Sequence, residues 1–386
     1  MSGTLRQAIR VVADDDEPAV VRDFTGWPDG RIDRSVFEQA PEPRGWFAEH
    51  RLLAGRGHLV VGVGGSSKTR LLYHLAIASV IGSLPWAWTI AKTGSAALFL
   101  TEDVATDVHH ALHLHGAALP PADRALLLER LRVFPLAGRH ARLLELAGAA
   151  LRETAVLGWL LQQLDALPPP VAFVGLDPAL GLSEGDELNP AHARRFGELV
   201  DRIGIESGAC CVATAHAAKA IHSADELGSH SARGSGAITD AVRGEFTLRN
   251  MTADEGRRFG ISDVAERKRY VQLAATKGNH LPPEAFAPVW LARGIGGALA
   301  EARLETARAS TIGGREMRAL DILRESAPPG GGGIALKFWR DKCIAAGVIV
   351  ADSPAAQEKA MTRVRESLVA AGLVASAGAR GAWQAT

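Results

Sequence analysis

The sequence Gly62-Val63-Gly64-Gly65-Ser66-Ser67-Lys68-Thr69, which follows the apolar run at residues 58–61, is the strongest indication of how this chain folds. A strand, a turn of small residues and a Lys-Thr pair that opens an apolar helix are the layout of a phosphate-binding loop. Small residues let successive backbone N–H groups turn toward a phosphate, and the helix adds the positive end of its dipole. In this layout Lys68 reaches the β- and γ-phosphates, and the Thr69 hydroxyl binds Mg²⁺. The stretch therefore predicts an NTPase.

One residue of the loop departs from the motif. The motif places a glycine directly before the lysine, where this chain has Ser67. Serine is small enough to keep the backbone close to a phosphate, but it lacks glycine's access to positive φ. The alternative interpretation is an ordinary Gly/Ser turn between a strand and a helix. Under the nucleotide interpretation, the predicted binding residues are Gly62, Gly64, Gly65, Ser66, Ser67, Lys68 and Thr69.

Length and composition favour a chain of two domains, with room for a small third piece. The chain has 386 residues, 43 Lys and Arg against 43 Asp and Glu, and 3 cysteines. The charge balance excludes a global basic field, so any contact with nucleic acid must come from a local patch. The few cysteines suit a reducing cytosol and support neither a disulfide framework nor a zinc site.

The chain carries no segment that is expected to enter a membrane. The N-terminus does not resemble a signal peptide. The most apolar long run, residues 71–91, is interrupted by His74, Gly82 and Pro85, and it fits a buried helix followed by a turn. We therefore expect a cytoplasmic protein with no membrane partner.

Strand-like and helical patterns alternate between residues 46 and 298, which predicts an α/β domain with a mostly parallel sheet. A helix at residues 190–205 has a clear start, with Asn189 as N-cap and Pro190 at the first helical position. Another helix, 70–81, continues from the phosphate loop. The predicted strands are 58–61, 95–100, 171–176, 209–214, 245–248 and 270–275.

The two ends of the chain differ from this central domain. Residues 1–45 are turn-rich and fit an N-terminal arm, and residues 299–315 fit a linker. Residues 316–386 contain helical patterns at 316–326, 336–346 and 355–371, followed by a short two-stranded hairpin. Three helices and a hairpin predict a small winged-helix-like domain.

Acidic residues follow two of the predicted strands. Glu102 and Asp103 follow strand 95–100, and Asp177 follows strand 171–176. Ligands of open α/β sheets bind beyond the carboxyl ends of the strands, so these acids lie at the edge expected for an active site. A carboxylate there could activate the attacking water, and Asp177 matches the Walker B acid that holds Mg²⁺. The alternatives are solvated strand ends and, for Asp177, a capping role before Pro178.

Three further residues are candidates for sensing or stabilising the transferred phosphate. His216 ends the strand that begins near residue 209, and Arg233 and Lys277 lie in short Gly-containing segments. A cation that a neighbouring subunit places against the phosphoryl group stabilises the transition state by several kcal/mol. The alternative for each is an ordinary strand end or a solvated surface charge.

Residues 46–280 resemble the RepA-type hexameric replicative helicases of plasmids and phages, which belong to the RecA-like ATPase superfamily. The resemblance rests on local strings that occur in the family's order. They are the Gly-Gly-x-x-Lys-Thr loop, Thr101-Glu102-Asp103 with His109-His110-x-Leu112-His113, Leu176-Asp177, His216-Ala217-Ala218-Lys219, Ala232-Arg233-Gly234-Ser235 with Asp240, Met251-Thr252-Ala253 and Lys277-Gly278-Asn279.

This resemblance implies a role for each matching residue. Lys68 and Thr69 would bind ATP and Mg²⁺, and Asp177 would be the Walker B acid. Glu102 would be the catalytic base and His216 the sensor. Arg233 would be an arginine finger acting in trans, with Lys277 assisting at the subunit interface.

The resemblance also implies a partner and an assembly. Such helicases form hexameric rings that translocate on single-stranded DNA, with channel loops that correspond here to residues 183–188 and 220–230. Both loops are poor in Lys and Arg. Besides Ser67, the chain departs from the family at Ala111, where the family has an arginine. The winged-helix-like tail does not follow from the resemblance.

The tail offers a second possible contact with DNA. In a winged helix the third helix lies in a groove and the wing touches phosphates. The basic residues available for this are Lys359, Arg363 and Arg365 on the helix and Arg380 in the wing. The alternative is a protein–protein module.

The sequence thus favours an ATP-dependent DNA helicase of a ring oligomer. The main alternative is an ATP-dependent replication initiator or regulator, in which the nucleotide controls assembly. A recombinase-like filament former and a metabolic P-loop kinase are less favoured.

Overall fold

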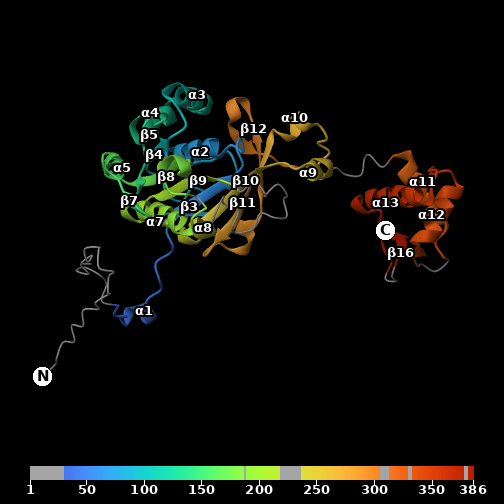
Figure 1. The fold of residues 1–386 in the computed structure, drawn as a ribbon. Coiled ribbons are helices and arrows are strands. Elements are labelled where there is room, and N and C mark those ends of the chain that lie inside the picture. Colours follow the sequence, from blue (N-terminus) through green and yellow to red (C-terminus); the bar gives the residue numbers. More distant parts are fainter. Residues whose placement is uncertain (1–29, 187, 218–235, 305–312, 329–332, 378–380) are drawn as a thin grey trace. The chain divides into compact units, whose positions relative to one another are not determined.

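A computed structural model describes residues 30–186, 188–217, 236–304, 313–328, 333–377 and 381–386. The chain divides into two units, Met1–Arg44 and Gly45–Thr386. Within the described part of the first unit, the short helix α1 spans Ser35–Glu38, and none of its side chains is buried. The second unit contains the central sheet and the C-terminal helices (Figure 1).

The central sheet has nine strands in the order β13-β12-β11-β10-β3-β9-β8-β4-β5 (Figure 1). The strands from β10 to β5 are parallel, and β11, β12 and β13 extend the sheet with antiparallel pairs. Their bounds are β3 Gly57–Gly62, β4 Ser95–Leu100, β5 Leu131–Pro135, β8 Val171–Asp177, β9 Cys210–His216, β10 Gly244–Asn250, β11 Tyr270–Gly278, β12 Val289–Arg293 and β13 Leu299–Glu301. This is the α/β fold with a mostly parallel sheet that is expected of a RecA-like P-loop core.

The central strands were predictable because they are continuous apolar runs. Every residue of β3 and β4 is buried, as is typical of parallel strands that are covered on both faces. The predicted ends of the six expected strands differ from those of β3, β4, β8, β9, β10 and β11 by only a few residues. The sequence did not indicate β5, β12 or β13, which are short and partly exposed.

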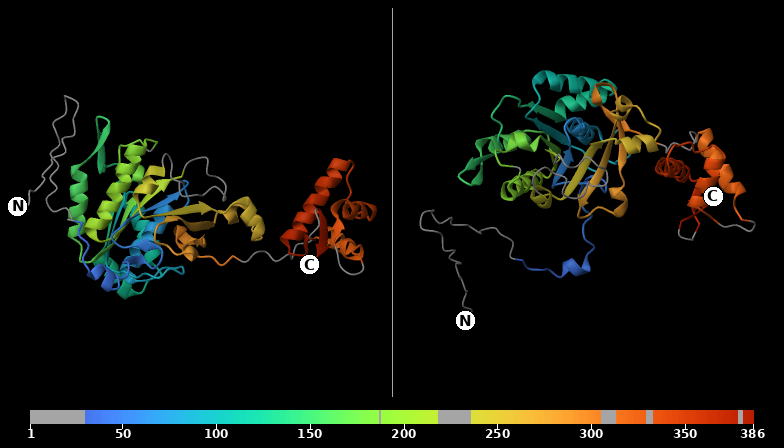
Figure 2. Two further views of the ribbon diagram at one scale, coloured as in Figure 1. Left: turned by 90° about the horizontal axis from the view of Figure 1, so that it is seen from below. Right: turned by 45° about the vertical axis from the view of Figure 1, so that its right-hand side comes forward.

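Helices cover both faces of the sheet (Figure 2). Helix α2 packs with α3 and α4 on one face, where a hydrophobic core surrounds Phe47, Trp86 and Val271. Helices α5 and α7 pack on the other face over a second core. The helices of this unit are α2 Lys68–Ile81, α3 Ala105–Gly116, α4 Pro121–Arg130, α5 Ala155–Asp165, α6 Ala179–Leu182, α7 Pro190–Ser207, α8 Gly236–Ala241, α9 Ala253–Arg258 and α10 Val264–Arg267.

Smaller elements connect the main ones. Two antiparallel pairs lie outside the central sheet, and two short 3-10 helices flank β12. The pairs are β1 Trp46–Ala48 with β2 Leu52–Leu53 and β6 Leu144–Ala147 with β7 Ala150–Glu153, and the 3-10 helices are η2 Pro283–Phe286 and η3 Ile295–Gly297.

Helix α7 lies very close to the start of β3. As predicted, the Asn189 side chain caps the first turn by accepting hydrogen bonds from two backbone N–H groups. A Cβ atom on Gly57 would lie 2.6 Å from the Asp201 backbone, so only glycine allows this approach. The Asp201 carboxylate binds the Arg56 guanidinium at 2.6 Å and accepts a hydrogen bond from Gly57 N at 2.8 Å. This partly buried ion pair joins the helix to the strand that leads into the phosphate loop.

The C-terminal segment encloses a hydrophobic core of its own around Trp339, which is fully buried and donates from Nε1 to Ala319 O at 2.8 Å. Its strand β14 was not indicated by the sequence, and it joins the two expected strands in a three-stranded sheet of order β14-β16-β15. The elements are α11 Gly314–Glu325, β14 Ile334–Ala335, α12 Leu336–Ala345, α13 Pro354–Ala370, β15 Val374–Ser376 and β16 Ala382–Ala385. Across the described residues, no helix has the length and apolar character that a membrane crossing requires.

We expect Asp201→Asn to lower the free energy of unfolding by about 2 kcal/mol at neutral pH, because it leaves Arg56 without its charged partner. Burial tends to raise the pKa of Asp201, but the hydrogen bonds from Arg56 and Gly57 outweigh it and lower that pKa. The contribution of the ion pair is therefore present at neutral pH and is lost as the pH falls through the lowered pKa.

Denaturant unfolding at several pH values measures this effect. The unfolding free energies of Asp201→Asn and the wild type should converge in acid. The control is Glu198→Gln on the same helix, which removes the exposed partner of Arg194 and should cost less than about 0.5 kcal/mol. Equal losses in the two variants would contradict the importance of the Arg56–Asp201 pair.

Candidate active site

The phosphate loop joins β3 to α2. β3 ends at Gly62 and α2 begins at Lys68, so residues 63–67 form the turn. The buried Lys68 Nζ donates hydrogen bonds to the carbonyl oxygens of Gly62 at 2.8 Å and Val63 at 3.2 Å. Burial lowers the pKa of Lys68, and two neighbouring carboxylates oppose that shift. The ammonium group therefore lies against the inside of the turn, where it can meet a bound phosphate.

Two residues at the base of the loop differ in what they offer a ligand. A side chain on Gly62 would collide with Ser66 Oγ and with the Leu248 carbonyl, so glycine is required there by packing. Ser66 Oγ is buried and makes no hydrogen bond to any described residue. An unpaired buried hydroxyl costs free energy unless a ligand or water satisfies it. This orphaned group in the loop fits a phosphate oxygen.

Asp177, at the end of β8, connects this strand to helix α2 and strand β9 at the floor of the site. Its Oδ2 accepts a hydrogen bond from Thr69 Oγ1 at 2.5 Å, and its Oδ1 accepts one from Thr214 Oγ1. Thr69 lies in the first turn of α2, and Thr214 lies on β9, between β3 and β8. The predicted metal-binding pair, Thr69 and Asp177, is thus in direct contact. Hard oxygen ligands of this kind suit Mg²⁺.

A second acidic group follows β4. Glu102 and Asp103 both line the same cleft as the phosphate loop. Burial raises the pKa of Asp103, and the nearby carboxylates of Asp177 and Asp107 raise it further. A carboxyl group with a raised pKa beside a nucleotide site is a candidate for accepting or donating a proton there. The structure therefore adds Asp103 to the predicted base Glu102 as a candidate for proton transfer.

The cleft brings most of the predicted site residues together. It has a volume of about 570 Å³ and lies at the carboxyl ends of β3, β4, β8 and β9. Its lining residues are Gly64, Gly65, Ser66, Ser67, Lys68, Thr69, Arg70, Glu102, Asp103, Asp107, His110, Asp177, Pro178, His216, Gly296 and Gly297. Gly62 ends β3 behind the loop and is not among them.

The structure does not bring Lys277 to this cleft. In the sheet register Lys277 pairs with Glu245, and Glu245 pairs with Leu59. These residues lie toward the start of β3, away from the phosphate loop that follows its end. Lys277 Nζ donates to the Thr239 carbonyl at 2.6 Å. Arg233 and residues 220–230 lie outside the described residues.

Several residues of the site were missed by the sequence prediction. Thr214 was visible only as a polar residue in an apolar strand. Gly296 and Gly297 come from the turn between β12 and β13, and the same hairpin carries Arg293, which bonds to the phosphate loop. The glycines at positions 294, 296 and 297 were the one signal in the sequence for that hairpin.

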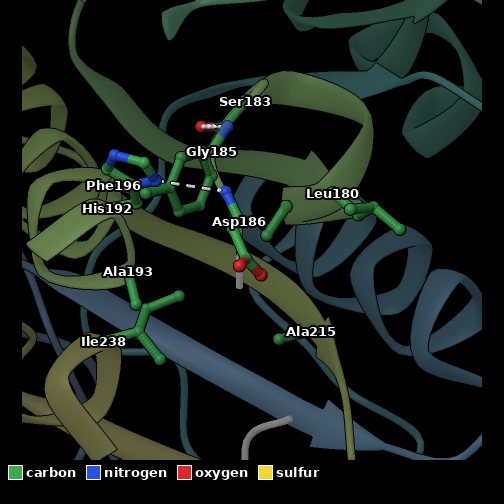
Figure 3. Close-up of a pocket in the computed structure, with 10 residues that line it drawn as sticks. Leu180, Ser183, Gly185, Asp186, His192, Ala193, Phe196, Ala215 and Ile238 are labelled. Carbon is green, nitrogen blue, oxygen red and sulfur yellow. Dashed lines mark hydrogen bonds between the residues drawn. The ribbon is translucent and has the colours of Figure 1, made fainter. Parts of the chain in front are cut away.

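A second cavity lies beside the first predicted channel loop, between α6, α7, β9 and α8 (Figure 3). It holds only about 30 Å³, which is enough for water but not for a nucleotide. In Figure 3, Asp186 lies close to His192, and its backbone N–H donates to His192 Nδ1 at 3.2 Å. Arg142 Nη1 donates to the Ser183 carbonyl at 3.0 Å. The described part of residues 183–188 is therefore held against its surroundings and carries no Lys or Arg.

The arrangement can bind and activate a nucleoside triphosphate. Lys68 and the loop N–H groups would hold the phosphates, and Thr69 with Asp177 would hold Mg²⁺. The metal ion, when bound, would neutralise charge that develops on the phosphate oxygens. Glu102 or Asp103 would orient and deprotonate the attacking water.

We expect Thr214→Val to raise the Mg²⁺ concentration for half-maximal ATP hydrolysis by about tenfold, because groups that orient a metal ligand typically contribute this much to metal affinity. Valine keeps the shape of the side chain but removes the hydroxyl that donates to Asp177. The measurement is hydrolysis rate against Mg²⁺ concentration. Thr214→Ser keeps the hydroxyl and should stay close to the wild type, and an unchanged Mg²⁺ dependence in Thr214→Val would contradict this role.

Two comparisons with known proteins give a match. A solved structure that matches is a KaiC-like protein from the hyperthermophilic archaeon Pyrococcus horikoshii OT3, with 11% sequence identity and a TM-score of 0.43 over 68% of this chain and 100% of that chain. A family model described as an AAA domain matches residues 28–221. This match spans just over half of the chain and contains the phosphate loop, Asp177 and His216. The chain therefore belongs to the AAA domain family.

Proposed function

We propose that this ATPase is a DNA helicase that moves along single-stranded DNA in plasmid or phage replication and hydrolyses ATP between the subunits of a ring. The observation that carries the proposal is the separation of the phosphate loop from Lys277. Among the described residues that line the cleft, the Lys and Arg side chains are Lys68 and Arg70. Phosphoryl transfer often uses an additional cation, which the same chain supplies in cis or a partner supplies in trans.

The position of Lys277 suits such a role. Its Nζ is fixed by the Thr239 carbonyl and lies 3.9 Å from Asp240 Oδ1, while its side chain stays partly exposed. Lys277 lies on β11, toward the start of β3 and away from the phosphate loop of its own chain. It would therefore serve the phosphate loop of an adjacent copy rather than its own. Together with Arg233, Lys277 would complete the site across a subunit interface, which favours a closed ring, such as a hexamer.

His216 would connect the nucleotide to the DNA. It ends β9 and lines the cleft, and it precedes the second predicted channel loop, residues 220–230. A residue that touches the γ-phosphate on one side and leads into a DNA-facing loop on the other can pass the state of the nucleotide to the channel.

The C-terminal segment would contact duplex DNA as a winged helix. Lys359 and Arg363 are exposed on α13, the third helix of this segment. Arg365 is less available, since its guanidinium lies 5.1 Å from the centre of the Trp383 ring. Arg380 lies outside the described residues. Lys359 and Arg363 are therefore the better candidates for phosphate contacts on this helix.

Mixing two inactive variants tests the shared site. We expect Lys68→Ala and Arg233→Ala each to abolish ATP hydrolysis that single-stranded DNA stimulates. Rings assembled from both variants should regain part of the activity, because some interfaces then combine an intact loop with an intact arginine. Arg124→Ala, which changes an exposed arginine on α4, should behave like the wild type. Two outcomes contradict the proposal: no recovery on mixing, or ATP binding without turnover that is indifferent to Arg233. The second would favour the nucleotide-controlled replication regulator.

Salt dependence tests the C-terminal contact. Replacing Lys359 and Arg363 with alanine should weaken duplex binding and reduce the slope of log affinity against log salt by about 1 per phosphate contact removed. The measurement is fluorescence anisotropy of a labelled duplex across a salt series. The double variant Arg318→Ala with Arg324→Ala on α11 removes the same number of exposed positive charges and serves as the control. Equal slopes in all variants would favour a protein-binding role for this segment.

A further inference from the structure

The backbone of the phosphate loop is strained where it meets α2. Ser67 has φ 75° and ψ 26°, and the only other described non-glycine residue with positive φ is His50. A side chain disfavours this conformation, which is why the motif has glycine at this position. Such strain persists only where the surrounding structure determines the conformation.

The loop has little packing of its own to fix this conformation. A Cβ atom added to Gly64 or to Gly65 would meet nothing within 4 Å. Ser66 N donates to the Val63 carbonyl at 3.2 Å, which closes one turn of the loop. Packing around Gly64 and Gly65 therefore does not fix the loop, and hydrogen bonds must hold this part of it.

Arg293, at the end of β12, supplies those hydrogen bonds. Its Nε donates to Ser67 Oγ at 2.7 Å, and its Nη2 donates to the Gly65 carbonyl at 2.7 Å. Nε and Nη2 form one edge of the planar guanidinium, so a single rigid group binds the loop at two points. No lysine can make this paired contact.

The guanidinium is itself anchored. Nη2 also donates to Asn250 Oδ1 at 2.8 Å, and Nη1 donates to the Lys268 carbonyl. Arg293 is partly buried, and burial lowers its pKa, but arginine stays charged at any physiological pH. The same hairpin turn places Gly296 and Gly297 in the wall of the nucleotide cleft. The hairpin between β12 and β13 therefore both braces the loop and borders the site.

We infer that Arg293 is a positioning residue for nucleotide binding and that Ser67 is the contact through which it acts, an inference that rests on the proposed nucleotide site. The serine is not a weakened form of the motif. Its hydroxyl accepts a hydrogen bond that glycine cannot accept, and this bond holds the loop in the conformation that presents Lys68 and Thr69.

The variant Ser67→Gly distinguishes the two possible roles of this serine. If the loop needed only backbone freedom, restoring the glycine of the motif would strengthen ATP binding. Since the hydroxyl is the contact for Arg293, we expect Ser67→Gly and Ser67→Ala both to weaken ATP binding by several fold. Arg293→Ala and Arg293→Lys should weaken it by about tenfold, because a misplaced binding group loses most of its contribution.

The experiment measures the dissociation constant of a fluorescent ATP analogue, KM and kcat for ATP, and the midpoint of thermal unfolding, all on the full chain. We expect KM and the dissociation constant to rise while the unfolding midpoint changes little. The double variant Ser67→Gly with Arg293→Ala should bind no more weakly than Arg293→Ala alone, because both changes break the same contact. Arg258→Ala, an exposed arginine on α9, is the matched control.

Three outcomes would contradict the role of Ser67 and Arg293 in nucleotide binding. Binding by Ser67→Gly that equals or exceeds the wild type would overturn the inference. So would additive effects in the double variant, or a fall in the unfolding midpoint of Arg293→Lys with unchanged nucleotide affinity. Lys68→Ala separates this inference from the proposed function. If the wild type and Lys68→Ala bind the analogue equally, the nucleotide site itself is wrong, whatever the Ser67 variants do.

Discussion

The hydrogen bonds that Thr69 and Thr214 donate to Asp177 are the contacts on which the candidate active site depends. They join the first turn of α2, the end of β8 and the strand between β3 and β8. The carboxylate can meet Thr69 only because β9 separates β3 from β8 and all three strands run in the same direction. The parallel arrangement brings the carboxyl ends of these strands to one edge, where a ligand meets residues from several elements. The candidate active site therefore depends on the order of the strands in the sheet as much as on the sequence of the phosphate loop.

Features that depend on residues close together in the sequence were predictable. The central strands are buried on both faces, so their sequences are continuous apolar runs, as in β8, and they are easy to recognise. The phosphate loop is a contiguous string, and the residues that follow β4, β8 and β9 were expected at one edge once the strands were assigned as parallel. Glu102, Asp177 and His216 therefore lie in the same cleft as Lys68, as expected. Their individual roles stay predictions.

Features that depend on contacts between residues far apart in the sequence were not predictable. β12 and β13 are short and partly exposed, so no run of apolar residues marks them. Arg293 meets Ser67 across 226 positions of the chain, and nothing in either local sequence indicates the other. Thr214 is one threonine among many until the structure places it beside Asp177. Lys277 was grouped with the site by its resemblance to a family motif, and only the strand register shows that it lies toward the other end of β3.

The departure at Ser67 illustrates why a motif position should be judged with its tertiary contacts. Considered alone, serine at a position of positive φ is a local conflict that destabilises the loop. In the fold the same side chain supplies an acceptor that the anchored guanidinium of Arg293 can use, and the local conflict gains a compensating contact. A glycine would relax the backbone but would leave Arg293 with one fewer partner and the loop with one fewer restraint. Because a Cβ atom added to Gly64 or Gly65 would meet nothing within 4 Å, close contact at these two positions cannot replace that restraint. The hairpin between β12 and β13, which lies beyond the residues matched by the AAA domain, would therefore be as much a part of the phosphate-binding machinery as the loop itself.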